Sequence, residues 1–181
     1  MRVFVLGTGR CGTKTFIAAC KHVTNFTCSH ERHYHGVYGE ARLTYPDNHI
    51  EADNRLGWML GLLEERYGGE PVYIHLQRDP HEVVNSFLRR WDNLGGIIPV
   101  LANGILHPPV GQVDWHEDER AAVAAFYVRM MTANLHAFLK DKPHVLNISL
   151  DSAKSSFREF WDRIGATGDL EAALSEWDVR H

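Results

Sequence analysis

The sequence predicts an α/β domain built on a central parallel sheet, with helices on both faces of the sheet. Short apolar runs of strand length alternate with longer segments whose apolar residues recur at helical spacing. The first apolar run passes directly into a glycine-rich turn and then into a helical segment. With 181 residues, 44% of them apolar and 23% charged, the composition suits one folded core. We therefore expect a single three-layer domain over residues 1–181.

The amino-terminal part of the chain begins with a strand, a glycine turn and a helix. Residues 3–6 are a short apolar run typical of a buried parallel strand. The glycine-rich turn occupies residues 7–12, and helical spacing follows over 13–22. Residues 25–29 are predicted as a short second strand, whereas residues 30–50, which are polar and rich in His, Tyr and Gly, are predicted as a loop.

The middle of the chain carries the clearest strand and the clearest helix start. A helix is predicted over residues 53–67, and residues 72–76 form the strongest strand pattern in the chain. The next helix begins with a capping arrangement, because Asp79 can cap it, Pro80 suits its first position and Glu82 completes a capping box.

The remaining elements follow the same alternation. Residues 93–114 contain four glycines and three prolines and are too long for a plain connection, so they are predicted to form a lid. A long amphipathic helix is expected over 117–140, a strand over 145–148, a helix over 151–164 and a terminal helix over 169–177.

Charge and cysteine usage limit the classes of partner. The net charge of −4 gives no general attraction to nucleic acid or to anionic membranes, so any anion site must be local. Cys11, Cys20 and Cys28 form no paired framework and are interpreted as reduced thiols. We predict no signal peptide from residues 1–12, where a short apolar run leads into glycines, and no apolar stretch in the sequence reaches membrane-spanning length. We expect a cytoplasmic protein with neither a nucleic acid nor a membrane as partner.

The glycine turn has the spacing of a phosphate-binding loop. A turn between a strand and a helix offers backbone N–H groups and the positive end of a helix dipole to an anion. Gly7 and Gly12 fit that spacing, but Thr13-Lys14-Thr15 follows, so the lysine is displaced by one position from its place in nucleoside triphosphatases. A cation lies inside the turn instead, at Arg10.

This turn resembles the 5′-phosphosulfate loop of sulfotransferases that use 3′-phosphoadenosine-5′-phosphosulfate (PAPS). In that family a Lys or Arg comes directly before Ser/Gly/Cys-Gly-Thr, as Arg10 does here. The resemblance implies that Arg10 contacts the oxygen that bridges sulfur and phosphorus. It also implies a P-loop type of fold, and it assigns the 5′-phosphate to Cys11, Gly12, Thr13, Lys14 and Thr15. Many members have a second Thr where this chain has Lys14.

A second segment resembles the 3′-phosphate motif of the same family. Arg78 follows a strand and precedes Asp79-Pro80, and Ser86 lies eight residues further on. The resemblance implies that Arg78 and Ser86 bind the 3′-phosphate, which a guanidinium can hold with two parallel hydrogen bonds. The alternative is that Arg78 is a helix-entry residue paired with Asp79 or Glu82 and that Ser86 is a small helix residue. Arg89 and Arg90, on the same helix, are interpreted as a solvated face.

The resemblance implies sulfuryl transfer from PAPS to a hydroxyl or amine, with adenosine 3′,5′-bisphosphate as the other product and no metal required. Arg10 takes the catalytic role of stabilising the leaving 5′-phosphate. The acceptor must lose a proton, and Glu31 is the first candidate base, because residues 28–31 are weakly similar to tyrosylprotein sulfotransferases. His30, His33 and Glu51 are alternates. The alternative interpretation is that Glu31 is a solvated loop acid.

Two further interpretations compete with sulfuryl transfer. An ATP-dependent small-molecule kinase with a degenerate P-loop needs Lys14 at the phosphates and Asp79 or Asp53 on magnesium. A nucleotide-binding module without catalysis is the second alternative. The acceptor stays open among small molecules, glycans and peptides. A metal site at His30, His33 and His35 is not predicted, because no Cys or carboxylate spacing completes it.

Overall fold

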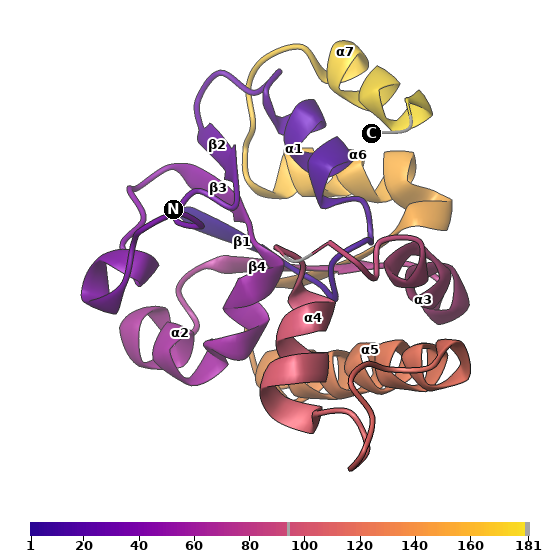
Figure 1. Ribbon diagram of the computed structural model, residues 1–181. Helices are drawn as coiled ribbons and strands as arrows, with labels where there is room; N and C mark the ends of the chain where they lie inside the picture. The colour runs from indigo at the N-terminus through magenta and orange to yellow at the C-terminus, as the bar shows by residue number, and fades with distance from the viewer. Residues whose placement is uncertain (94, 180–181) are drawn as a thin grey trace.

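The protein folds as an α/β structure around a sheet of five parallel strands, which confirms the predicted fold class. The computed structural model describes residues 1–93 and 95–179 (Figure 1). The sheet has the order β2-β3-β1-β4-β5. The strands are β1 (Arg2–Leu6), β2 (Thr27–His30), β3 (His49–Ala52), β4 (Val72–Gln77) and β5 (Val145–Ser149).

Helices cover both faces of the sheet. The α-helices are α1 (Thr13–Cys20), α2 (Leu60–Tyr67), α3 (Pro80–Leu88), α4 (Ile97–Leu101), α5 (Glu117–Leu139), α6 (Ala153–Arg163) and α7 (Leu170–Ser175). The short helical turns are η1 (Gly39–Leu43), η2 (Asn54–Trp58), η4 (Leu150–Ser152) and η5 (Glu176–Asp178), and η3 (Ala102–Leu106) is a π-helix. One face of the sheet packs against α1, α6 and α7, and the other against α2, α3 and α5 (Figure 1).

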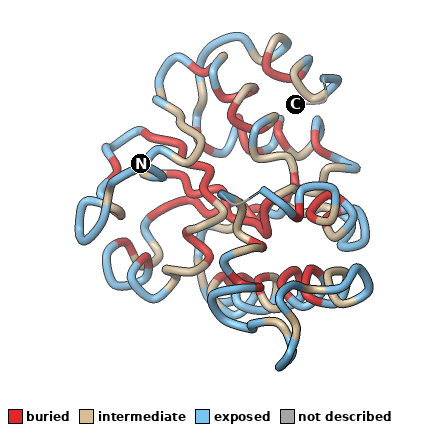
Figure 2. Tube along the Cα trace, in the orientation of Figure 1, coloured by how far each residue is buried: buried red, intermediate tan, exposed pale blue. Residues whose placement is uncertain are grey.

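The alternation of side chains along each strand divides the core into two halves. Val3 and Val5 of β1 belong to the cluster on the side of α1 and α6, whereas Phe4 and Leu6 belong to the cluster on the side of α5. All four side chains are fully buried, because a parallel sheet with helices on both faces has no solvated side (Figure 2). This explains why residues 3–6 read as an unbroken apolar run.

The prediction of a loop over residues 30–50 was wrong at its end, where strand β3 (His49–Ala52) lies between β1 and β2. The strand escaped detection because two of its residues are polar. His49 and Glu51 are nevertheless buried, and their side chains are 3.2 Å apart. Ser29 on β2 donates a hydrogen bond of 2.5 Å to the Glu51 carboxylate. These hydrogen bonds allow the polar side chains of His49 and Glu51 to be buried. The same polar residues interrupt the apolar pattern from which a buried strand is predicted.

The helix predicted over residues 53–67 is two elements in the structure. Asp53 caps the turn η2 by accepting a hydrogen bond of 2.8 Å from the Arg55 N–H, and α2 begins only at Leu60. The predicted start of α3 is confirmed, since the Asp79 side chain accepts a hydrogen bond of 3.0 Å from the Glu82 N–H and Pro80 is the first helical residue.

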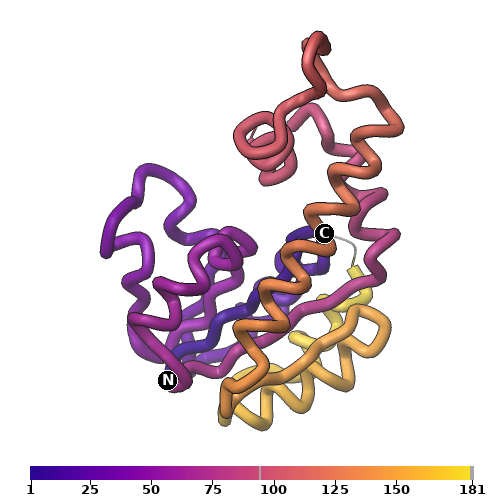
Figure 3. Tube along the Cα trace, turned by 90° about the horizontal axis from the view of Figure 1, so that it is seen from below, coloured from indigo at the N-terminus to yellow at the C-terminus, as the bar shows by residue number. Residues whose placement is uncertain are grey.

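The segment predicted as a lid contains helical structure. Within residues 93–114 lie α4 and the π-helix η3, and the chain then continues without regular structure to α5. Figure 3 shows this segment extending away from the sheet beyond the end of α3. Val110 and Val113 near its tip are fully exposed. Its movement as a lid stays a prediction. Among the described residues, no helix combines the length and apolarity needed to cross a membrane.

A buried histidine on β4 makes stability depend on pH. His75 is 3% exposed, and burial, with a contribution from His136, lowers its pKa to about 4. The unfolded chain takes up this proton near pH 6.5. The stabilisation is therefore present above pH 6.5 and lost as the pH falls toward 4.

We expect the wild type to lose about 2 kcal/mol more unfolding free energy between pH 7 and pH 4.5 than the His75→Gln variant. Urea unfolding at both pH values measures this difference. His144→Gln, which changes an exposed histidine, is the control and should follow the wild type. Equal losses in the wild type and in His75→Gln would contradict the role of His75.

Candidate functional site

A cavity of about 1280 Å³ opens at the carboxyl edge of the sheet. Residues from the segment that follows each of the five strands line it. Glu31, Arg78 and Leu150 come directly after β2, β4 and β5, whereas Gly9 and Asn54 lie three and two residues after β1 and β3. Open parallel α/β sheets bind their ligands at this edge, where the loops that follow the strands converge. The cavity exceeds the 300–1,000 Å³ that is typical of a small-molecule site, so it has room for more than one ligand.

The glycine turn forms the floor of this cavity. Gly9, Arg10 and Gly12 have φ angles of 80°, 59° and 95°, so the chain passes repeatedly through the left-handed region. The left-handed φ of Gly12 disfavours a residue with a Cβ atom, and a Cβ atom there would also lie 2.6 Å from the Leu150 side chain, which would have to shift. Successive left-handed residues turn backbone N–H groups to one side, and α1 begins directly after Gly12. The turn is therefore suited to hold an anion.

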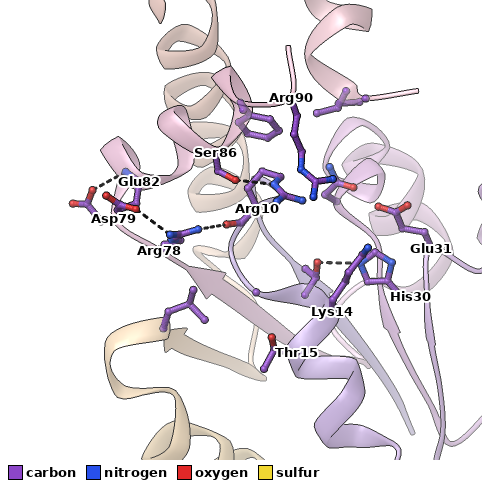
Figure 4. Close-up of a pocket in the computed structure, with 18 of the residues that line it drawn as sticks. Arg10, Lys14, Thr15, His30, Glu31, Arg78, Asp79, Glu82, Ser86 and Arg90 are labelled. Atoms are coloured by element: carbon purple, nitrogen blue, oxygen red, sulfur yellow. Dashed lines mark hydrogen bonds and ion pairs between the residues drawn. The ribbon is translucent and has the colours of Figure 1, made fainter. Parts of the chain in front are cut away.

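Eight of the nine predicted site residues line the cavity. They are Arg10, Gly12, Thr13, Lys14, Thr15, Glu31, Arg78 and Ser86 (Figure 4). The exception is Cys11, whose side chain is 1% exposed and packs in the core beneath the turn. Burial raises the pKa of the Cys11 thiol to about 11. Contact between Cys11 and a bound anion is therefore restricted to its backbone N–H.

The two sequence motifs meet at the mouth of the turn. Arg10 donates a hydrogen bond of 2.9 Å from Nε to the hydroxyl of Ser86, 76 positions away in the sequence. Arg78 donates from Nη1 to the Arg10 carbonyl at 3.2 Å, and its Nη2 forms an ion pair of 3.1 Å with Glu82. The Arg78 guanidinium therefore contacts Glu82 at the start of α3 and the backbone of the glycine turn at the same time.

The cavity concentrates positive charge in a protein whose net charge is −4. Among the residues that the structure describes, seven basic side chains line it, namely Arg10, Lys14, Arg55, Arg78, Arg89, Arg90 and Lys154. Four acidic side chains from the same described part of the chain do so, namely Glu31, Asp79, Glu82 and Asp151. Burial, followed by the positive charges of Arg90, Arg78 and Arg89, lowers the pKa of Arg10. A bound anion would relieve this repulsion, so the site favours anionic ligands.

The predicted base Glu31 points into the cavity from the residue after β2 (Figure 4). Its φ of 54° is left-handed, and its carboxylate forms an ion pair of 2.9 Å with Arg55. The Arg55 guanidinium lies 4.0 Å from the centroid of the Tyr34 ring. Arg55 and Tyr34 both donate hydrogen bonds of 3.3 Å to the Gly95 carbonyl. Arg55, which is itself held by Tyr34 and by the Gly95 carbonyl, therefore orients the Glu31 carboxylate.

Of the three alternate bases, His30, His33 and Glu51, the structure places only His30 at the cavity. His30 lines the cavity, and its Nε2 is 3.0 Å from the Thr13 hydroxyl. His33 stacks on Tyr45 with ring centroids 4.8 Å apart, outside the cavity lining. Glu51 is fully buried beneath the sheet edge. Within residues 1–93 and 95–179, no three His, Cys, Asp or Glu side chains gather as a group that could hold a metal ion.

Several residues at the site were not identified as functional from the sequence. Arg55 follows β3, and the polar pattern of that strand concealed its position at the sheet edge. Arg89 and Arg90 are exposed, as a solvated face requires, yet both also line the cavity. Glu51 accepts a hydrogen bond of 3.0 Å from the Arg32 N–H, and so supports the strained turn at Glu31.

A scan against models of protein families and a search of curated proteins find no match for this chain. The interpretation of its function therefore depends on the cavity and on the residues that line it.

Proposed function

We propose that the protein is a sulfotransferase that moves a sulfuryl group from PAPS to a hydroxyl or amine of a small-molecule, glycan or peptide acceptor. The observation that carries this proposal is the convergence of two distant motifs. Arg78 and Ser86 lie at the mouth of the glycine turn, hydrogen-bonded to the backbone and side chain of Arg10. Separate cationic and hydroxyl groups at one cavity suit a nucleotide with phosphates at two positions.

The groups that line the cavity fit the two anionic ends of PAPS. The glycine turn and the start of α1 would hold the 5′-phosphosulfate through backbone N–H groups, with Lys14 on the first turn of the helix. Arg78 and Ser86 would hold the 3′-phosphate, because a guanidinium matches the geometry of phosphate oxygens. The volume of about 1280 Å³ leaves space for an acceptor beside the nucleotide.

The side chains of this protein then have distinct roles in the reaction. PAPS supplies the sulfuryl group when it is bound. Arg10 stabilises the negative charge that develops on the departing 5′-phosphate oxygen. Glu31 accepts the proton that the acceptor hydroxyl or amine loses. Arg55 keeps the Glu31 carboxylate directed into the cavity through their 2.9 Å ion pair.

The kinase alternative has less support from the same residues. Asp53 is fully buried, and its carboxylate pairs with Arg42 at 2.5 Å and accepts the Arg55 N–H at 2.8 Å. These partners leave Asp53 poorly placed to bind magnesium. Asp79 lines the cavity, but one of its oxygens caps α3. The arrangement therefore favours electrostatic stabilisation of the transferred group by fixed cations over a metal-dependent step.

Ligand-dependent unfolding temperatures test the proposal. Adenosine 3′,5′-bisphosphate without metal should stabilise the protein by about 2.7 kcal/mol at one hundred times its Kd. Radiolabelled PAPS should then transfer its sulfuryl group to a member of a panel of phenols, sugars, amines and tyrosine peptides. Stabilisation by Mg-ATP alone would overturn the proposal in favour of a kinase. Binding of the bisphosphate with no transfer would leave a module that only binds nucleotide.

The proposed 3′-phosphate site predicts the effect of Arg78→Ala. We expect the affinity for adenosine 3′,5′-bisphosphate to fall about 30-fold, which corresponds to about 2 kcal/mol for a lost charge-assisted contact. Isothermal titration calorimetry measures this change. Arg66→Ala, which removes an arginine paired with Glu40 outside the cavity, is the control. An affinity of Arg78→Ala equal to that of the wild type would reject the 3′-phosphate assignment.

A further inference from the structure

A network of buried polar side chains lies beside the turn at Glu31. His49 and Glu51 on β3 are 1% and 0% exposed, and the roles assigned above to the cavity residues use neither of them. On the neighbouring strand β2, Thr27 lies opposite His49 and Ser29 lies opposite Glu51. Burying polar groups at these positions costs free energy that apolar side chains would avoid. The network therefore calls for an explanation beyond the packing of the sheet.

Three donors converge on the Glu51 carboxylate. The Ser29 hydroxyl donates to one of its oxygens at 2.5 Å, and His49 Nε2 lies 3.2 Å from the same oxygen. The Arg32 N–H donates to the other oxygen at 3.0 Å. With its ring proton on Nε2, His49 donates to Glu51 while its Nδ1 accepts from the Thr27 hydroxyl at 2.8 Å. Both oxygens of Glu51 are thus held in fixed positions.

The contact with the Arg32 N–H is the point where this network reaches the cavity. Glu31 has a left-handed φ of 54°, which a residue with a side chain rarely adopts. Its own N–H donates to the Ala52 carbonyl at 3.0 Å, and the next N–H along the chain, that of Arg32, donates to Glu51. Strand β3 therefore holds the N–H groups on both sides of Glu31. Such a backbone conformation persists only where the surrounding structure determines it.

We propose, on the basis of the proposed function, that Glu51 is a positioning residue for the base Glu31. Through the Arg32 N–H, Glu51 holds the left-handed turn from which the Glu31 side chain enters the cavity. Ser29 and His49 fix the carboxylate of Glu51 for this task. Glu51 is buried and does not line the cavity, so it contacts neither the nucleotide nor the acceptor.

Hydrogen exchange of the Arg32 amide, measured by NMR on the protein without ligand, tests whether Glu51 holds the turn. Glu51→Leu removes the acceptor of this N–H at similar side-chain size, so the amide should exchange about 10-fold faster than in the wild type. Glu51→Gln keeps an acceptor oxygen, because Ser29 and His49 can reverse their donor directions, and should stay within about 2-fold. Wild-type protection of the Arg32 amide in Glu51→Leu would overturn the proposal.

Transfer kinetics with the best acceptor test the consequence for the base. Glu51→Leu should lower kcat about 100-fold, because the base is misplaced. Its affinity for adenosine 3′,5′-bisphosphate should change less than about 2-fold, since the nucleotide contacts are intact. Glu51→Gln should recover most of kcat. Equal losses of kcat in both variants, or faster amide exchange in Glu51→Leu with an unchanged kcat, would overturn the positioning role.

Tyr67→Phe is the matched control for the loss of buried hydrogen bonds. The Tyr67 hydroxyl donates to the Leu43 carbonyl at 2.6 Å and accepts from the Tyr45 N–H at 3.1 Å, outside the lining of the cavity. This variant should lower the free energy of unfolding but leave the Arg32 amide and kcat as in the wild type. A loss of kcat equal to that of Glu51→Leu would show general destabilisation and overturn the proposal.

Ser29→Ala provides the same tests if Glu51→Leu does not fold, because Ser29 is only partly buried. Loss of its hydroxyl should speed exchange of the Arg32 amide and lower kcat, each about 3-fold or more. Wild-type values of both quantities would overturn the proposal. If the wild-type protein transfers sulfate to no acceptor, the proposed function fails and the catalytic consequence fails with it. The exchange of the Arg32 amide still decides in that case whether Glu51 holds the turn.

Discussion

Glu31→Gln lowers the rate of sulfuryl transfer between about 100-fold and 1,000-fold, which is the expected effect of removing a general base. The amide has nearly the shape of the carboxylate and can still contact Arg55, but it accepts no proton from the acceptor. The affinity for adenosine 3′,5′-bisphosphate should change less than about 2-fold, because Glu31 lies on the side of Arg10 opposite Arg78 (Figure 4). Steady-state transfer of radiolabelled sulfate and calorimetry measure the two quantities separately.

The control for this variant is another acid in the same part of the chain. Glu40 on η1 pairs with Arg66, and both lie outside the lining of the cavity. Glu40→Gln should therefore transfer sulfate at the rate of the wild type. Normal rates in Glu31→Gln would show that Glu31 is a solvated loop acid, as the alternative interpretation holds. His30, which lines the same cavity, would then be the next base to test through His30→Gln.

Arg10→Ala is expected to lower kcat about 100-fold to 1,000-fold, comparable to the loss of one preorganised donor to a developing oxyanion. The affinity for adenosine 3′,5′-bisphosphate should fall only a few-fold, since the backbone of the turn and Arg78 remain. The negative charge on the bridging oxygen increases as the sulfuryl group departs. The contact with Arg10 is therefore stronger in the transition state than in the bound donor.

Substitution by lysine separates the charge of Arg10 from its other contacts. Arg10→Lys should recover a large part of kcat, because a cation at the bridging oxygen is the required feature. Both variants keep a side chain at φ 59°, so the conformational demand on the turn is unchanged. A kcat of Arg10→Ala equal to that of the wild type would show that another cation stabilises the leaving group. Lys14 is the candidate on the same turn.

The local parts of the site were readable from the sequence. The glycine turn is encoded by residues that tolerate left-handed backbone, and α3 is started by Asp79 and Pro80 within a few residues of Arg78. These signals depend on backbone geometry over short distances. They placed Arg10 and Arg78 after buried strands, and the structure confirms those positions at the carboxyl edge of the sheet.

Strand β3 shows why other parts of the site could not be predicted from the sequence. Its residues His49 and Glu51 are polar but buried, and they are satisfied by hydrogen bonds with Ser29 on the neighbouring strand. A pattern of apolar residues predicts a buried strand only where the buried residues are apolar, so it misses polar residues that are buried with hydrogen-bond partners. Because β3 was not predicted, the sequence did not indicate that Arg55 lies at the edge of the sheet. Its ion pair with Glu31 was therefore not predicted either.

By itself, the sequence determined the α/β class, the glycine turn and the start of α3, because these features follow from spacing and from the conformations of individual residues. The tertiary structure alone decided that Cys11 points into the core, that Glu31 faces the cavity while Glu51 does not, and that Arg90 approaches Arg10. The direction of each of these side chains is set by segments tens of residues away in the chain. Such contacts form only when the strands and helices pack, and no local pattern encodes them.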